Sequence, residues 1–145
     1  MESTTLPPRL AETRDDFLAL GIPDRLQLLL EFANELPALP ARYADHPDLL
    51  ERVVECQSPV FIFVEVLDGL AHLHATAPAE SPTTRGFASI LVQGIDGLAP
   101  DEVLAIPDDY PQSLGLGAAV SPLRVRGMTA MLARVKRQLR AQASA

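Results

Sequence analysis

Residues 54–76 read VECQSPVFIFVEVLDGLAHLHAT and decide the centre of the fold. Two apolar runs, 60–67 and 70–76, flank the dipeptide Asp68-Gly69, and the first run is rich in β-branched and aromatic residues. Asp-Gly between such runs is typical of a two-residue hairpin turn, in which both residues take a positive φ. The stretch therefore predicts an antiparallel hairpin, and residues 52–54 are predicted to add a third, edge strand.

Prolines divide the rest of the chain into helices, because proline suits the first turn of a helix and ends a helix elsewhere. Apolar spacing predicts helices at about 7–20, from Pro23 to 36, at 85–94 capped by Thr83 or Thr84, and at 100–104. Residues 41–50 and 108–117 are predicted to be loops with at most short helices. Ser121-Pro122 is a suitable N-cap and first-turn pair for a long last helix. Its apolar side is predicted to comprise Leu123, Met128, Met131, Leu132, Val135 and Leu139.

This order of elements predicts an α+β fold, with N-terminal helices and a long C-terminal helix packed on one face of a small three-stranded antiparallel sheet. The 145 residues fit a single domain, 1–145, with 1–5 and 141–145 expected to be disordered. Hydrophobic residues make up 48% of the chain, which indicates a folded protein. No apolar stretch reaches the roughly 18 residues of a membrane span, and no secretory signal is seen, so we expect a cytoplasmic protein.

Charge is distributed unevenly along the chain. All nineteen acidic residues precede Ser121, whereas six basic residues and no acidic residue follow from Arg124 onward. A basic helix can bind nucleic acid or a membrane, but no aromatic residue is interleaved with these bases and the acidic remainder would repel phosphate. We therefore predict neither partner, and we read the basic residues as a solvated or protein-docking helix face.

The chain has one cysteine, Cys56. A single thiol can neither form an internal disulfide nor hold an iron–sulfur cluster alone, since a cluster generally needs about four protein ligands. Its simplest functions are nucleophile, sulfur carrier or redox sensor. The polar neighbours Glu55, Gln57 and Ser58 favour a turn at the edge of the sheet over a buried strand.

Four segments resemble the SufE family of sulfur acceptor proteins. Residues 55–61, ECQSPVF, resemble the family's G-C-Q-S-x-V-W segment, and Arg85-Gly86 resembles its [RK]-G at a helix start. Residues 121–128, SPLRVRGM, resemble its S-P-S-R-x-x-G-[LM] segment, and Leu36-Pro37 with Leu39 resembles the L-P-x-L that ends its second helix. Each string is weak alone, but the four occur in the family's order around a matching hairpin.

The resemblance implies a fold of the SufE/IscU type and a protein that takes sulfur from the persulfide of a cysteine desulfurase onto Cys56. The sulfur would then pass to iron–sulfur cluster assembly, with a cluster scaffold as acceptor and no cofactor beyond the transient persulfide. The chain is not expected to be a desulfurase itself, because its only lysine, Lys136, lies far in sequence from the thiol. Two alternatives stay open: loading of Cys56 by a rhodanese-type sulfurtransferase, and a non-catalytic docking or regulatory module.

Five residues are predicted to support Cys56, namely Glu55, Gln57, Ser58, Arg85 and Arg124. Gln57 and Ser58 could hydrogen-bond the sulfur or shape the turn. Arg124 could pair with Glu55, with a carboxylate of the partner or with the thiolate, and Arg85 is a second cation near a helix start.

Glu55 replaces the family's usual glycine. A glutamate takes positive φ less freely than glycine, so the geometry of the loop is expected to differ from the family's. Its carboxylate is expected to raise the pKa of the neighbouring thiol. His72 and His74 share a strand face, but no third or fourth ligand accompanies them, so no metal site is predicted.

Overall fold

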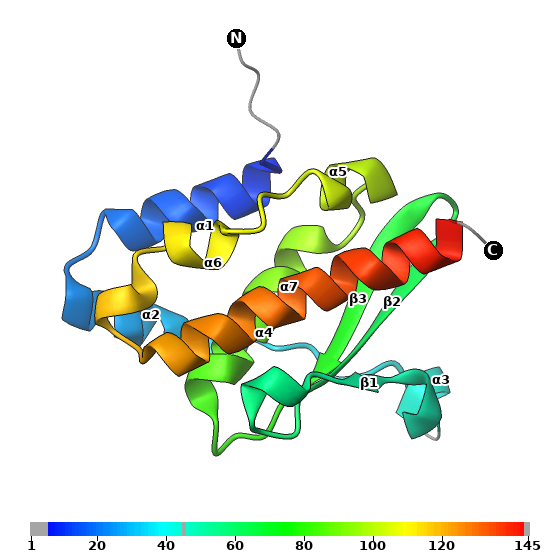
Figure 1. The fold of residues 1–145 in the computed structure, drawn as a ribbon, viewed down its shortest axis with the longest axis horizontal. Coiled ribbons are helices and arrows are strands. Elements are labelled where there is room, and N and C mark those ends of the chain that lie inside the picture. The colour runs from blue at the N-terminus through cyan, green and yellow to red at the C-terminus, as the bar shows by residue number, and fades with distance from the viewer. Residues whose placement is uncertain (1–5, 45, 144–145) are drawn as a thin grey trace, which may run out of the picture.

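The computed structural model describes residues 6–44 and 46–143, and the predicted α+β fold is confirmed (Figure 1). Helices α1 (Pro8–Leu18) and α2 (Ile22–Asn34) come first, followed by α3 (Ala41–Ala44) and the short 3₁₀-helix η1 (Pro47–Leu49). The sheet follows and is succeeded by further helices, which are α4 (Pro82–Ile95), α5 (Pro100–Leu104), α6 (Tyr110–Ser113), the 3₁₀-helix η3 (Leu116–Ala118) and α7 (Pro122–Ala143).

The sheet has three antiparallel strands in the order β1 (Glu51–Arg52), β2 (Phe61–Leu67) and β3 (Leu70–Thr76). The predicted hairpin is confirmed, with Asp68 at φ 54° and Gly69 at φ 80° in its turn. The edge strand is shorter than predicted. It ends at Arg52, because residues 54–56 turn into the 3₁₀-helix η2 (Val54–Cys56) instead of continuing along β2.

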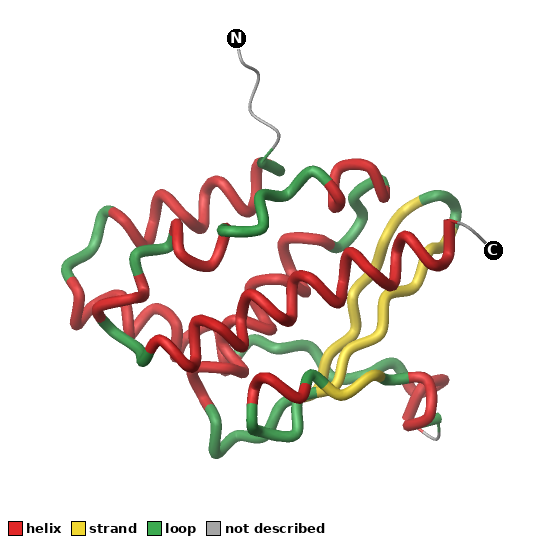
Figure 2. The backbone as a smooth tube through the Cα atoms, viewed as in Figure 1, coloured by secondary structure: helices red, strands yellow, loops and turns green. Residues whose placement is uncertain are grey.

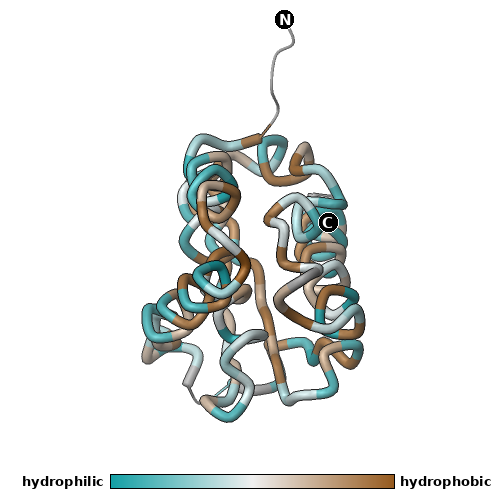
Figure 3. The backbone as a smooth tube through the Cα atoms, turned by 90° about the vertical axis from the view of Figure 1, so that its left-hand side faces the viewer, coloured by the Kyte–Doolittle hydropathy of each residue, from teal (hydrophilic) through white to brown (hydrophobic). Residues whose placement is uncertain are grey.

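The long helices α4 and α7 pack against one face of the sheet, with α4 against β3 and α7 against β2 (Figure 2). The short helix α3 lies on the opposite face, where Tyr43 contacts Phe63 and His74. Alternate strand residues point to the face that α4 and α7 cover and are buried, namely Ile62, Val64, Ala71, Leu73 and Ala75. They join one hydrophobic core with the buried residues of the helices. In Figure 3 the hydrophobic stretches of the helices turn toward one another, and the hydrophilic stretches turn outward.

Helix α7 runs along the molecule and crosses the hairpin (Figure 1). Strand β1 pairs with β2 only at Phe61 and Ile62, which leaves the main chain of Val64 without a strand partner on that side. Two glutamines of α7 supply the missing hydrogen bonds. Gln138 Oε1 accepts from Val64 N (2.8 Å), and Gln142 Nε2 donates to Val64 O (2.6 Å). The helix thus satisfies polar groups that a longer β1 would have bonded.

The C-terminal end of the chain differs from the prediction. We expected residues 141–145 to be disordered, but α7 continues to residue 143, because Gln142 is bound to the sheet. Residues 1–5 and 144–145 lie outside the described part of the chain. No helix within 6–44 and 46–143 is long and apolar enough to cross a bilayer.

Helix boundaries differ from the prediction at two further points. Helix α4 begins at Pro82, three residues before the predicted start, because Ser81 rather than a threonine is the N-cap residue and proline occupies the first turn. Helix α2 ends at Asn34, not at residue 36. The start of α7 is confirmed, with Arg124 N donating to Ser121 Oγ (3.3 Å), and its predicted apolar side is buried except for Leu123, which is exposed.

Candidate functional site

Cys56 is the last residue of η2, in the loop that joins β1 to β2. The loop is closed at its base by Val53 N donating to Val60 O (2.9 Å), and Cys56 N donates to Val53 O (3.1 Å). Its left-handed residue is Gln57, at φ 61°, whereas Glu55 lies within the 3₁₀ turn. A residue with positive φ therefore follows the cysteine, and the glutamate before it carries no such strain.

The thiol lies against the first turns of α7. Cys56 Sγ donates to Gly127 O (3.6 Å), and the side chain is half-buried. Gly127 makes this contact possible, because a Cβ built on it would lie 3.2 Å from both Sγ and Cα of Cys56 and 3.4 Å from Glu55 O. Such separations are tighter than nearly all real Cβ contacts. Because Gly127 has no side chain, the thiol can lie directly against α7. We call this position of Cys56 against Gly127 the seat of the thiol.

The resting thiol is a weak acid. Burial is the main cause, the carboxylate of Glu55 adds to it, Arg134 opposes it, and together they raise the pKa of Cys56 from 9.0 to about 11. The expected effect of Glu55 is therefore present in direction but comes second to burial. Because the thiolate is the nucleophile, the buried conformation is an unreactive one.

A cluster of charges fixes the loop to α7. Arg134 pairs with Glu51 of β1 (Nη1–Oε2, 2.8 Å) and, through Nη2, with Glu55. Glu51 also accepts from Arg137 and from Gln138 Nε2 (Oε1, 3.0 Å). The hydrogen bond from Arg134 lowers the pKa of Glu55, so this carboxylate is ionised at neutral pH. Part of the basic stretch at the C-terminus therefore neutralises the two acids that precede Cys56.

Gln57 and Ser58 shape the loop. The Oγ atoms of Ser58 and Ser81 are hydrogen-bonded at 2.6 Å, which joins the end of the loop to the start of α4. Gln57 is exposed, and its main-chain N–H donates to Val54 O (3.2 Å). Among the described residues, the hydrogen bond of Cys56 Sγ is made to Gly127 and not to either of these side chains.

The two predicted arginines lie in different environments. Arg124 is exposed, and its Nη1 donates to Thr83 Oγ1 (3.2 Å). Of the three partners considered for Arg124, Glu55 is paired with Arg134 instead. Arg85 binds main-chain carbonyls, with Nε donating to Ala33 O (2.9 Å) and Nη1 to Ala77 O (2.6 Å). Those bonds join α4 to the ends of α2 and β3, so the role of Arg85 is structural.

The two strand histidines lie on one face, as predicted, and each faces its own carboxylate. His72 Nδ1 lies 2.6 Å from Asp96 Oδ1, and His74 Nε2 lies 3.0 Å from Glu65 Oε1. No group of three or more metal-ligating side chains occurs within 6–44 and 46–143.

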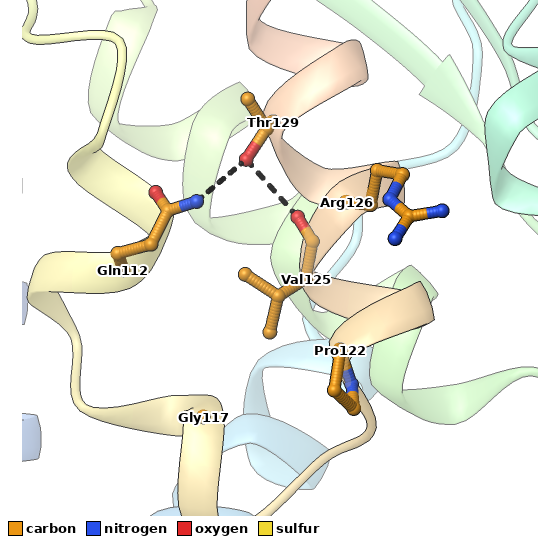
Figure 4. Close-up of a pocket in the computed structure, with 6 residues that line it drawn as sticks. All are labelled: Gln112, Gly117, Pro122, Val125, Arg126 and Thr129. Atoms are coloured by element: carbon orange, nitrogen blue, oxygen red, sulfur yellow. Dashed lines mark hydrogen bonds between the residues drawn. The ribbon is translucent and has the colours of Figure 1, made fainter.

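A hollow of about 430 Å³ lies beside the first turns of α7 (Figure 4). Its polar groups bond one another, since Gln112 Nε2 donates to Thr129 Oγ1 (3.1 Å), which donates to Val125 O (3.1 Å). Arg126 turns its guanidinium away from Gln112 (Figure 4). Cys56 does not line this hollow, and its thiol lies on the loop between β1 and β2.

Sequence reasoning missed three residues of the site, which are Glu51, Gly127 and Arg134. Gly127 and Arg134 are seven positions apart, which places them on one face of a helix two turns from each other. That spacing was visible in the sequence. Nothing in the sequence indicated that this face of α7 would lie on the Cys56 loop.

Comparisons with known proteins identify the family of the chain. The family model of SufE, described as an Fe-S metabolism associated domain, matches residues 11–139. A SufE-like protein of Mycobacterium tuberculosis is 55% identical over 137 residues, which cover 94% of each chain. A SufE-like protein of Synechocystis is 27% identical over 128 residues, covering 88% of this chain and 77% of that protein.

A solved structure has the same fold and a related sequence. The solution structure of a hypothetical protein from Thermus thermophilus is 36% identical and superimposes with a TM-score of 0.83, covering 97% of this chain and 99% of that one. The family match spans most of the chain, including the Cys56 loop and most of α7. The chain therefore belongs to the SufE family, whose domain is associated with Fe–S metabolism.

Proposed function

We propose that the protein is a sulfur carrier that accepts the outer sulfur of a cysteine desulfurase persulfide on Cys56 and delivers it to iron–sulfur cluster assembly. The observation that carries this proposal is the seat of the thiol, which is half-buried against Gly127 at the end of a short loop. A buried seat protects a bound persulfide from solvent and oxidant. A short loop held by side-chain contacts can leave that seat without unfolding the core.

The chemistry requires one bond to form and one to break. The Cys56 thiolate attacks the outer sulfur of the donor's persulfide, forming a new S–S bond while the donor's own S–S bond breaks. The donor leaves as a thiolate, and Cys56 keeps the transferred sulfur as a persulfide. No external oxidant or reductant is needed, because the sulfane sulfur keeps its oxidation state.

The resting pKa makes opening of the loop part of the reaction. With the pKa of Cys56 at about 11, the thiolate fraction at pH 7 is about 10⁻⁴. Exposure to solvent would return the pKa toward its ordinary value of 9.0 and would raise that fraction about a hundredfold. Docking of the donor is therefore expected to select the conformation in which the loop is open.

Intact-mass measurement tests the proposal. Incubation with a cysteine desulfurase and free cysteine is expected to add one sulfur atom to the wild-type protein and none to Cys56→Ser. The absence of an adduct on the wild type, or the same adduct on the variant, would overturn the proposal. Replacing the donor by a rhodanese and thiosulfate decides whether that enzyme loads Cys56 instead.

Delivery and partner docking are tested with the same protein. The loaded protein is expected to transfer its sulfur to a cluster scaffold, followed as loss of the adduct. If the protein instead acts as a docking module, Cys56→Ser would stimulate the desulfurase as fully as the wild type does. In that case Arg124→Glu, which changes an exposed cation near the loop, would abolish the stimulation.

A further inference from the structure

Arg134 binds two acids at the Cys56 loop, Glu51 before the loop and Glu55 within it, and the two are held unequally. Glu51 has Arg134, Arg137 and Gln138 as partners and belongs to β1, so it is anchored by side chain and main chain. Glu55 pairs with Arg134 and with no other basic side chain of the described residues. Its side chain is 42% exposed, compared with 31% for Glu51. The contact with Glu55 is thus the weaker part of the cluster.

We propose that Arg134 is a positioning residue that locks the Cys56 loop closed, and that the lock opens by loss of the Glu55 contact while the Glu51 contact remains. That this lock regulates sulfur transfer rests on the proposed function. That the lock exists does not rest on it, since opening of the loop can be measured without a sulfur donor.

Opening of the loop costs Arg134 little free energy. An arginine buried without a counter-ion would be costly, but Arg134 keeps Glu51 when Glu55 leaves. In the closed loop, Arg134 Nε is buried and lacks a hydrogen-bond acceptor among the described residues. Release of Glu55 lets the guanidinium turn toward Glu51 or water and satisfy that nitrogen. The freed carboxylate is already partly hydrated and moves into solvent.

The boundaries of the moving segment follow from its hydrogen bonds. Val53 is fully buried and bonded to Val60, and Ser58 is bonded to Ser81. Only residues 54–57 lie between these anchors. Gln57 is in the left-handed region, which is unfavourable for a residue other than glycine. The closed conformation therefore carries strain that opening can release, and the contact between Arg134 and Glu55 opposes that release.

Amide hydrogen exchange of residues 54–57 tests the lock. Glu55→Gln keeps the size of the side chain and removes its charge. A partly exposed ion pair contributes enough to slow opening about two- to fivefold, so exchange of the Cys56 and Gln57 amides is expected to accelerate by that factor. Arg134→Gln is expected to act alike, and the double variant is expected to exchange no faster than Arg134→Gln.

Arg137→Gln is the matched control, because it removes a cation from the same helix and the same cluster without touching Glu55. It is expected to leave this exchange at the wild-type rate. Exchange decides the question better than alkylation does, since loss of the Glu55 charge also eases ionisation of the thiol. Unchanged exchange in Glu55→Gln, or equal acceleration in Arg137→Gln, would overturn the proposal. Accelerated exchange without any sulfur adduct would keep the lock and reject the proposed function.

Discussion

Replacing Gly127 by alanine changes the seat of the thiol by one methyl group. The added Cβ would lie 3.2 Å from the Sγ and Cα atoms of Cys56, so the loop has to move away by a few tenths of an ångström. Alanine inside a helix is more favourable than glycine by about 0.8–1.0 kcal/mol. Displacing a loop held by a partly exposed ion pair costs up to about 1 kcal/mol. These effects oppose each other, so the free energy of unfolding is expected to change by less than about 1 kcal/mol.

The effect on the thiol is expected to be larger. If the displaced loop loses its burial, the pKa of Cys56 falls from about 11 toward 9.0, which raises the thiolate fraction at pH 7 about a hundredfold. A less basic thiolate is also a poorer nucleophile, with a Brønsted coefficient of about 0.4–0.5, which removes about tenfold of that gain. Alkylation by iodoacetamide at pH 7 is therefore expected to be about tenfold faster in Gly127→Ala.

The assay is the pH dependence of the alkylation rate, with urea unfolding measured on the same samples. Gly117→Ala is the control, because its Cβ would meet no atom within 4 Å. It is expected to alkylate at the wild-type rate. If Gly127→Ala gains the full stability of the helix substitution while its thiol keeps the wild-type pKa and rate, the methyl fits without moving the loop. The assignment of Gly127 as the seat of the thiol would then be wrong.

Three further predictions concern other parts of the molecule. Although burial opposes its ionisation, hydrogen bonds from neighbouring side chains lower the pKa of Glu65 from 4.5 to about 2. Its stabilising effect is thus present above pH 4.5 and lost as the pH falls toward 2, and Glu65→Gln is expected to lack this acid-dependent loss in urea unfolding. Arg85→Gln removes two hydrogen bonds from a charged donor, each worth about 1.5–3 kcal/mol. It is expected to cost about 3 kcal/mol or more in urea unfolding while Cys56 alkylates at the wild-type rate. Tyr110→Phe removes a buried hydrogen bond of 2.7 Å to a main-chain carbonyl and is expected to cost about 1 kcal/mol in thermal unfolding.

Features that depend on neighbouring residues could be predicted from the sequence. The turn at Asp68-Gly69 needs two positive φ angles, and Ser121-Pro122 supplies the cap and first turn of α7 within three residues. The α+β fold class followed from the order of such elements. The prediction was less accurate where a distant contact decides a local boundary. Ser81 is the N-cap residue of α4, but its hydroxyl binds Ser58 and makes no capping hydrogen bond. Strand β1 ends where the chain turns toward α7.

The sequence by itself determined that Cys56 is the one thiol and that polar residues place it in a turn beside the hairpin. Only the tertiary structure decided what the thiol touches. Gly127 is 71 positions from Cys56, and Arg134 is 79 positions from Glu55. Local propensities cannot specify such pairs, because they depend on where the core holds the long helix against the sheet. The same packing pairs Glu55 with Arg134 and not with Arg124, one of the partners considered from the sequence, since Arg134 lies on the helix face that meets the loop.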